Sequence, residues 1–283
     1  MAPQLLSRRI TMRGFIDSDT ERIYFEYWGD GGETVILGHG MGGNHAVWYQ
    51  QVAYLASRYR VVTWDQRGFG RSTNISGDIG PVPSVDDMVR LLDHLEIDGG
   101  HVVGQSMGGW SALGFAIDHP DRTMSLVLAD TTAGIFTPRI RQTLADYGRE
   151  IAAGPPPEQL PLGHHPAVGS QLLGEDLAQS FLYSQLGSLT DPPGPMAVIP
   201  LLLTTDHTGR AGKVRAPTLF VVGEHDPIFP PPLIESAAGF IEGSAVAIIG
   251  NSGHSPYFER PQFWNDVVAG FMRDSSPDRR GTE

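Results

Sequence analysis

Short runs of aliphatic and β-branched residues alternate along the chain with stretches in which apolar residues recur every three or four positions. The runs have the composition of strands buried on both faces, and the stretches between them have the period of amphipathic helices. This alternation is typical of βαβ units around a mostly parallel sheet. The runs that we predict to be strands are Arg22–Trp28, Thr34–Leu37, Arg60–Asp65, His101–Gly104, Ser125–Leu128, Thr218–Val222 and Ala245–Ile249.

Helix signals lie between these runs. Ser84, with Asp87 three residues later, is typical of a helix N-terminus, and apolar residues at helical spacing follow it. Near the end of the chain Pro261 suits a first helical turn, and the aromatic and aliphatic residues after it recur every four positions. The pattern therefore predicts helices that connect the strands and cover the sheet.

The alternation breaks between about Thr131 and Lys213, where Gly and Pro cluster and no buried-strand run is visible. Large apolar residues persist there, among them the run Phe181–Tyr183, which disfavours the alternative of a flexible linker between two domains. We therefore predict a helical cap at residues 131–213, inserted into a core formed by residues 1–130 and 214–283. The polar tail Asp274–Glu283 is predicted to be disordered.

Charge and composition exclude several classes of function. The chain has 283 residues, a formal net charge of -12 and no dense Lys/Arg run, so it lacks the electrostatic footprint of a nucleic-acid or anionic-membrane binder. It has no cysteine, which excludes disulfide frameworks, thiolate catalysis and Cys-ligated metals. We expect a small-molecule substrate, no nucleic-acid or membrane partner, and a monomer or homodimer.

The first residues indicate where the protein acts. Met1–Arg13 holds three arginines and only one short apolar pair, Leu5-Leu6, which is too little for the core of a signal peptide. No apolar run approaches the roughly 18 residues that a membrane helix needs. These features predict a soluble, cytoplasmic protein.

A Gly-x-Ser-x-Gly motif at Gly104–Gly108 directly follows a predicted strand and opens a helix-like stretch. Strand, sharp turn and helix are the context of a nucleophile elbow, in which glycines let the backbone make a strained turn that raises the serine hydroxyl above the sheet edge. The motif alone is common by chance in a chain with 35 glycines, so its position after a buried strand is what makes it specific. Ser106 is therefore the candidate nucleophile.

Two strand ends further along the chain carry a candidate base and a candidate acid. A serine nucleophile needs a base, and the base needs an acid that holds its tautomer. Asp226 follows the strand at 218–222 and His254 follows the strand at 245–249. Parallel sheets place their sites at the carboxyl ends of strands. We therefore expect Ser106, Asp226 and His254 to lie together at the edge of the sheet that these strand ends form, called here the sheet edge. Asp130, which also follows a core strand, competes with Asp226 for the role of acid.

With these features, the chain resembles the α/β-hydrolase fold family over nearly its whole length outside the predicted cap. His39–Gly42 looks like the family's loop after the third strand, and Asp65–Ser72 resembles the turn after the fourth. Residues 223–230 and 253–261 are similar to its acid and base signatures. The resemblance implies an α/β architecture with an eight-stranded, mostly parallel sheet, an antiparallel second strand and helices on both faces.

The resemblance also implies roles for individual groups. The backbone N–H groups of Met41 and Met107 would form an oxyanion hole, which stabilises charge that develops only in the tetrahedral intermediate. His39 would be structural. The glycine three residues before Asp226 and the proline after it match the family's commoner acid position, which favours Asp226 over Asp130.

The other histidines of the loops offer no competing site. His225 lies beside the candidate acid, and His164 and His165 lie in a Gly/Pro-rich stretch, so we interpret all three as solvated. No spacing of His with Asp or Glu suggests a metal site. We expect neither a metal nor a cofactor.

The combined pattern predicts a serine hydrolase that transfers an acyl group from a small-molecule carboxylic ester or lactone to water through an acyl-enzyme on Ser106. Hydrolases that cleave carbon–carbon bonds of ring-cleavage products use a similar elbow and stay an alternative. A proline iminopeptidase is less favoured, because residues 39–42 lack that group's proline. Haloalkane dehalogenases and epoxide hydrolases are disfavoured, because they need an aspartate in place of Ser106.

Two hypotheses belong to other classes. Residues 38–43 also satisfy Gly-x-Gly-x-x-Gly after a strand, and Asp65 ends the next strand, which are features of a dinucleotide-dependent oxidoreductase. That hypothesis leaves Ser106, Asp226 and His254 unexplained. A ligand receptor without turnover is the second, because a fold does not determine a function.

Overall fold

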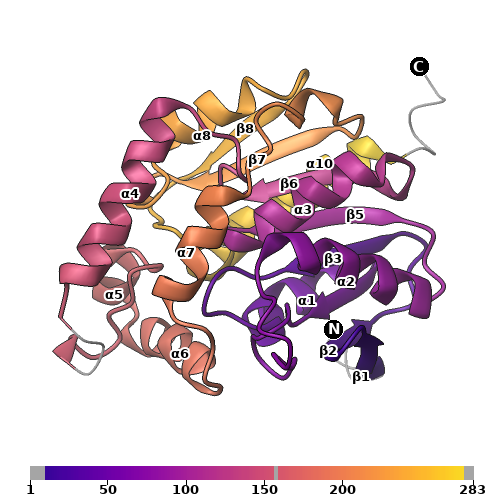
Figure 1. Cartoon of the computed structure of the whole chain (residues 1–283), viewed down its shortest axis with the longest axis horizontal. Coiled ribbons are helices and arrows are strands. Elements are labelled where there is room, and N and C mark those ends of the chain that lie inside the picture. The colour runs from indigo at the N-terminus through magenta and orange to yellow at the C-terminus, as the bar shows by residue number, and fades with distance from the viewer. Residues whose placement is uncertain (1–9, 156–158, 277–283) are drawn as a thin grey trace, which may run out of the picture.

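An eight-stranded sheet runs through the computed structural model, which describes residues 10–155 and 159–276 (Figure 1). Its strand order is β1-β2-β4-β3-β5-β6-β7-β8. β2 is antiparallel to both of its neighbours, and the strands from β4 to β8 run parallel, which confirms the predicted architecture. The strands are β1 (Ile10–Ser18), β2 (Glu21–Trp28), β3 (Thr34–Gly38), β4 (Arg60–Trp64), β5 (Gly100–Gln105), β6 (Thr123–Ala129), β7 (Thr218–Gly223) and β8 (Ala245–Ile249).

Helices cover both faces of this sheet (Figure 1). They connect successive strands at the places where the sequence shows helical periodicity. The helices outside the stretch between β6 and β7 are α1 (Tyr49–Leu55), α2 (Pro81–His94), α3 (Met107–Asp118), α8 (Pro231–Ala238), α9 (Pro256–Glu259) and α10 (Pro261–Ser275), with short 3₁₀ turns at His45–Trp48 and Pro120–Arg122.

The side chains of the parallel strands pack into two hydrophobic cores, one on each face. In β3, Ile36 packs in the core that contains residues of α2, α3 and α8, whereas Val35 and Leu37 pack in the core that contains residues of α1 and α10. Successive residues of a strand point to opposite faces, so a strand covered on both sides is apolar at every position. This explains why the sequence shows unbroken apolar runs there.

β1 was not among the predicted runs. It pairs with β2 in antiparallel register at the edge of the sheet, where Gly14 lies opposite Phe25. Ile16 is buried, but its neighbour Phe15 is 38% exposed. An edge strand needs only one apolar face, so its sequence pattern is weaker than that of a central strand.

The predicted start of α2 at Ser84 was wrong. The helix begins at Pro81 with Gly80 as N-cap, and the Ser84 hydroxyl donates to the Gly80 carbonyl at 2.8 Å. A proline at the first helical position has its φ already set, so the helix starts one turn earlier than the serine suggested. Asp87 takes no part in the helix cap, and its Oδ1 pairs with the guanidinium of Arg67 at 2.6 Å.

The described residues between β6 and β7 form four α-helices, which lie together on one side of the molecule (Figure 1). Val198 and Leu202 of this stretch are buried in the same core as residues of α2 and α3. The division into a core and a cap at 131–213 stays a prediction. The helices, called here the inserted helices, are α4 (Pro138–Ala153), α5 (Ser170–Glu175), α6 (Leu177–Ser188) and α7 (Pro195–Thr204), followed by a 3₁₀ turn at Ala211–Lys213.

The two ends of the chain lie partly outside the described residues. This applies to residues 1–9, on which the interpretation of the start depended, and to 277–283 of the predicted disordered tail. Asp274 and Ser275 belong to α10, so the disorder predicted for these two residues was wrong. Across the described ranges, every helix is too short or too polar to cross a membrane.

Candidate active site

Ser106 lies at the sharp turn between β5 and α3, with φ 48° and ψ −119°. A residue other than glycine at positive φ is strained, and such strain persists only where the surroundings impose it. Here the Ser106 N–H donates to the Ala129 carbonyl at 2.9 Å, and the Ser106 carbonyl accepts from the Gly109 N–H at 2.9 Å. Ser106 therefore has the backbone conformation and the strand-turn-helix context of a nucleophile elbow.

The two glycines of the motif are required by close backbone contacts. A Cβ on Gly104 would lie 2.3 Å from the Gly108 carbonyl oxygen, and a Cβ on Gly108 would lie 2.6 Å from the Gly38 carbonyl oxygen. Both distances are far below van der Waals contact. Glycine at these positions lets α3 start directly against the ends of β5 and β3, which leaves Ser106 at the sheet edge.

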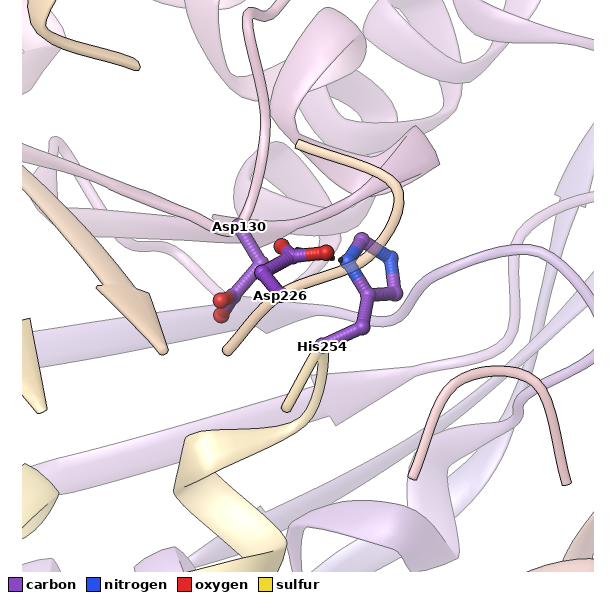
Figure 2. Close-up of side chains that lie close together, drawn as sticks. All are labelled: Asp130, Asp226 and His254. Carbon is purple, nitrogen blue, oxygen red and sulfur yellow. Dashed lines mark hydrogen bonds and ion pairs between the residues drawn. The ribbon is translucent and has the colours of Figure 1, made fainter. Parts of the chain in front are cut away.

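His254 and Asp226 meet beyond the ends of β8 and β7 (Figure 2). The Nδ1 atom of His254 lies 2.8 Å from Oδ2 of Asp226, and both side chains are buried. Oδ1 of Asp226 accepts from the backbone N–H groups of Ile228 at 2.8 Å and Phe229 at 3.0 Å. Three donors thus surround the Asp226 carboxylate, which stabilises its charge and fixes its orientation toward the imidazole.

The loop that carries His254 is attached to the elbow by a side chain. Gln105, the residue before Ser106, donates from Nε2 to the His254 carbonyl at 3.1 Å. The structure therefore brings the turn with Ser106, the loop with His254 and the loop with Asp226 to the same sheet edge, as the strand-end argument predicted.

Glu259 holds the same loop from the other side. Its buried carboxylate accepts from the N–H of Gly253 at 2.9 Å and from the N–H of Ser255 at 3.1 Å, the two residues that flank His254. A hydrogen bond from the Gly169 N–H also reaches it, from the segment of the inserted helices. The sequence displays Glu259 in the base signature but contains no signal for this role.

We expect Glu259→Gln to lower both activity and stability. The amide oxygen can still accept from one of the two N–H groups, but the NH₂ group opposes the other, and a buried donor without an acceptor costs about 1–3 kcal/mol. The free energy of unfolding in urea and kcat/KM measure the two effects.

The matched control is Glu175→Gln. Glu175 is exposed and contacts the neighbouring Arg260 and Asn251, so its loss should change little. An equal, small effect of both substitutions would show that the backbone of the loop is held without Glu259.

Asp130 lies beside the Asp226–His254 pair at the end of β6 (Figure 2). Its Oδ1 accepts from the Gly223 N–H at 2.9 Å, and the side chain is fully buried. Burial and the negative charge of Asp226 raise the pKa of Asp130 well above its ordinary value. The hydrogen bond to His254 is made by Asp226 and not by Asp130, and the role of Asp226 as the acid stays a prediction.

One ligand atom from each of Asp130, Asp226 and His254 lies within 4.8 Å of the others, a spacing that could hold a cation. The 2.8 Å separation of His254 Nδ1 and Asp226 Oδ2 is that of a hydrogen bond, and Asp226 Oδ1 already accepts from two N–H groups. The Asp226 carboxylate and Nδ1 of His254 are therefore already engaged in hydrogen bonds, so these side chains do not fit a metal well.

The loop predicted to supply the oxyanion hole lies against the elbow. A Cβ on Gly40 would lie 2.2 Å from Oε1 of Gln105 and 3.1 Å from the Cβ of Ser106, so a larger residue there would displace the Gln105 side chain. Met107 is buried, and Met41 packs partly buried against the same core. Their N–H groups as an oxyanion hole stay a prediction.

His39 has no free ring nitrogen. Its Nδ1 contacts the Gly40 carbonyl oxygen at 2.7 Å, and its Nε2 accepts from the Gln66 N–H at 3.1 Å. Burial lowers the pKa of His39, so the neutral ring is favoured. An imidazole with both nitrogens bonded to the backbone fits the structural role that the resemblance implied.

Asp65, the acid of the dinucleotide hypothesis, is likewise engaged in hydrogen bonds within the protein. Its buried carboxylate accepts from the His45 N–H at 2.6 Å and from the Arg71 N–H at 2.8 Å. A Cβ on Gly70 would lie 2.3 Å from this carboxyl group. Asp65 thus holds the turn at residues 65–72 and is not presented to a ribose.

His165 was predicted to be a solvated loop residue, and this was wrong. It is half-buried, its ring packs edge-on against Tyr183 with 4.9 Å between the ring centroids, and its Nδ1 accepts from the Ala167 N–H at 3.1 Å. Burial, followed by repulsion from His254 and His164, lowers the pKa of His165 to about 4. His164 and His225 are exposed, as predicted.

The lowered pKa of His165 predicts a measurable pH dependence of stability. The unfolded chain binds a proton on His165 near its ordinary pKa of 6.5, and the folded chain binds it only near about 4. In that window the unfolded state holds more protons, so the free energy of unfolding falls as the pH falls. His165→Asn keeps an acceptor for Ala167 and should reduce the fall, as urea titrations between pH 6.5 and 4 can measure.

His164→Asn is the control for this prediction, because His164 is the exposed neighbour of His165. It should leave the pH dependence as in the wild type. Identical slopes for wild type and His165→Asn would contradict the assignment. The difference between variants is the quantity to compare, because buried His39, His101 and His207 also have lowered pKa values.

Comparisons with known proteins agree with this architecture. A family model described as alpha/beta hydrolase fold matches residues 33–261. A protein of Azorhizobium caulinodans that bears the name carbamate hydrolase RutD is 29% identical, covering 88% of this chain and 94% of that protein. A 2-hydroxy-6-oxononadienedioate/2-hydroxy-6-oxononatrienedioate hydrolase of Cupriavidus pinatubonensis is 30% identical, covering 94% of this chain and 95% of that protein.

A solved structure is similar over the same extent. A thermophilic esterase from Thermogutta terrifontis superposes with a TM-score of 0.76 at 27% identity, covering 94% of this chain and 99% of the esterase. The matches extend through the segment of the inserted helices, so they concern the whole described architecture and not the sheet alone.

Proposed function

Since the chain belongs to the α/β-hydrolase fold family, we propose that it hydrolyses a small-molecule carboxylic ester or lactone through an acyl-enzyme on Ser106. The observation that carries the proposal is the buried hydrogen bond between His254 Nδ1 and Asp226 Oδ2, at the same sheet edge as the strained Ser106. The family and the sequence relatives support hydrolase chemistry. An ester or lactone as the substrate class is the part that we propose.

The proposed reaction follows from the bonding of the imidazole. Because Asp226 accepts the proton on Nδ1, the Nε2 atom of His254 is left as the basic nitrogen and can take the proton of the Ser106 hydroxyl. The serine oxygen then attacks the carbonyl carbon, and the N–H groups of Met41 and Met107 would stabilise the oxyanion. His254 returns the proton to the leaving alcohol, and a water molecule resolves the acyl-enzyme by the same path.

The esterase similarity supports an ester or lactone as substrate. The names of the two sequence relatives add a carbamate and a vinylogous diketone as the other substrates to test. All four classes present a carbonyl group to the same nucleophile, so the bond that breaks depends on the groups that surround the site.

The proposal also covers the partners and the predicted cap. We expect a single small-molecule substrate and a monomer or homodimer, with neither nucleic acid nor membrane as partner. The inserted helices would shape the substrate pocket. His165, in the same segment of the chain, lies close enough to His254 that repulsion between the two rings contributes to the lowered pKa of His165. The dinucleotide hypothesis is disfavoured, because the Asp65 carboxylate already accepts a hydrogen bond from the His45 N–H and Gly40 lies against the Gln105 side chain.

A covalent probe tests the nucleophile before any substrate is known. An organophosphonate with a good leaving group should add once to the full chain, and the mass increase should map to the peptide with Ser106. Ser106→Ala should remain unlabelled. Turnover on a panel of acyl esters, lactones, carbamates and vinylogous diketones then identifies the bond. Labelling at another residue would contradict Ser106 as the nucleophile. Binding of these compounds without any turnover would favour a ligand receptor.

A further inference from the structure

The carboxyl group of Asp130 is an unusual feature beside the candidate site. It is fully buried, and its Oδ1 accepts one backbone N–H, from Gly223. Over the residues that the structure describes, Oδ2 of Asp130 is enclosed and has no donor within hydrogen-bonding distance. An ionised carboxylate oxygen without a donor is strongly disfavoured in a buried site.

Asp226 and Asp130 differ sharply in the number of donors that they receive. Asp226 receives three, from the N–H groups of Ile228 and Phe229 and from the imidazole of His254. Asp130 receives one. Two adjacent buried carboxyl groups cannot both ionise at low cost, so the negative charge resides on the group with more donors and the proton on the other.

From these contacts we infer that Asp130 is a neutral positioning residue, which carries a proton on Oδ2 and donates it in a hydrogen bond to the carboxylate of Asp226. This inference rests on the proposed function, because its consequence is a third fixed contact on the acid that orients His254. A carboxyl-to-carboxylate bond also supplies the missing partner of the enclosed Oδ2 atom.

The charged and titratable groups around Asp130 agree with a neutral state. Burial is the largest cause of the raised pKa of Asp130, and the negative charges of Asp226 and Glu259 raise this pKa further. The neighbouring phenols of Tyr183 and Tyr257 have raised pKa values themselves, partly because of burial. His254, which has a ring nitrogen within 4.8 Å of an Asp130 oxygen, already pairs with Asp226 through Nδ1.

An infrared difference spectrum tests the protonation state without any substrate. The full chain at neutral pH, wild type minus Asp130→Asn, should show the C=O stretch of one protonated carboxyl group. A difference band from an ionised carboxylate instead would overturn the inference. The same spectrum with Glu259→Gln shows what another buried carboxyl group contributes.

Activity of two substitutions tests the positioning role. Asp130→Asn keeps an acceptor for Gly223 and offers an amide N–H to Asp226, so kcat/KM should stay within about threefold of the wild type. Asp130→Leu has the same branched outline, with two methyl groups in place of the oxygens, but neither a donor for Asp226 nor an acceptor for Gly223. Its kcat/KM should fall about tenfold or more, mainly in kcat, with the acid limb of the pH–rate profile moved to higher pH.

The outcomes separate this inference from the proposed function. If Ser106→Ala keeps full activity, the proposed function fails. If Ser106→Ala is inactive but Asp130→Asn loses as much activity as Asp130→Leu, only the inference fails, because the charge of Asp130 is then required. An unchanged pH–rate profile in Asp130→Leu would reduce Asp130 to a structural residue and also overturn the inference.

Discussion

Ser106→Ala is expected to abolish turnover, with a loss in kcat on the order of 10⁶-fold. The hydroxyl is the group that would form the acyl-enzyme, and neither the Asp226–His254 pair nor an oxyanion hole can replace it. Alanine keeps the Cβ atom at φ 48°, so the strain of the turn is unchanged. Steady-state kinetics on any substrate from the panel, with thermal unfolding in parallel, measures both quantities.

Ser106→Gly distinguishes chemistry from strain. Glycine adopts positive φ without steric cost, so this variant should be as inactive as Ser106→Ala and yet more stable than it, by about 1 kcal/mol. Exposed Ser188→Ala is the control and should behave as wild type. Activity of Ser106→Ala near the wild-type level would refute the proposed mechanism.

Asp226→Asn should lower kcat by about 10⁴-fold. The two N–H groups of Ile228 and Phe229 will hold the amide oxygen, so the amide nitrogen must face Nδ1 of His254. Two donors cannot face each other, and the ring is then forced to carry its proton on Nε2. In that tautomer the imidazole cannot accept the proton of Ser106. Kinetics and the ¹⁵N chemical shifts of the ring test the two halves of this argument.

Asp130→Asn is the matched comparison for Asp226→Asn, since it makes the same chemical change in the neighbouring carboxyl group. Only Asp226 contacts the imidazole, so the loss in Asp130→Asn should be far smaller. The opposite ranking would move the acid to the end of β6.

Central strands were predicted well, and the edge strand was not. Residues such as Val35, Ile36 and Leu37 lie between two helical layers, so burial on both faces leaves an unbroken apolar run. β1 lies at the sheet edge with Phe15 partly exposed, and such a strand carries little pattern. The start of α2 was misplaced because Ser84 and Pro81 both signal a helix start, and local propensity does not decide between them.

The elbow was predictable because backbone geometry restricts its residue types. At Gly104 and Gly108 a side chain would collide with the backbone, and this requirement is visible as a motif. His165 had no such signal. Its burial depends on Tyr183 and on the inserted helices, which lie next to it only after the chain has folded.

The sequence by itself determined the order and type of the central elements, the elbow with Ser106, and the strand ends that carry Asp226 and His254. Each of these depends on local periodicity or on a steric requirement within a few residues. Only the tertiary structure decided the state of the two acids. Asp130 and Asp226 follow the adjacent strands β6 and β7. Asp226 accepts from two N–H groups of its own loop, at Ile228 and Phe229, whereas the Gly223 N–H that reaches Asp130 comes from 93 positions away. The packing of β6 against β7 places the two carboxyl groups side by side, where they compete for one negative charge, and no single stretch of sequence contains both of them.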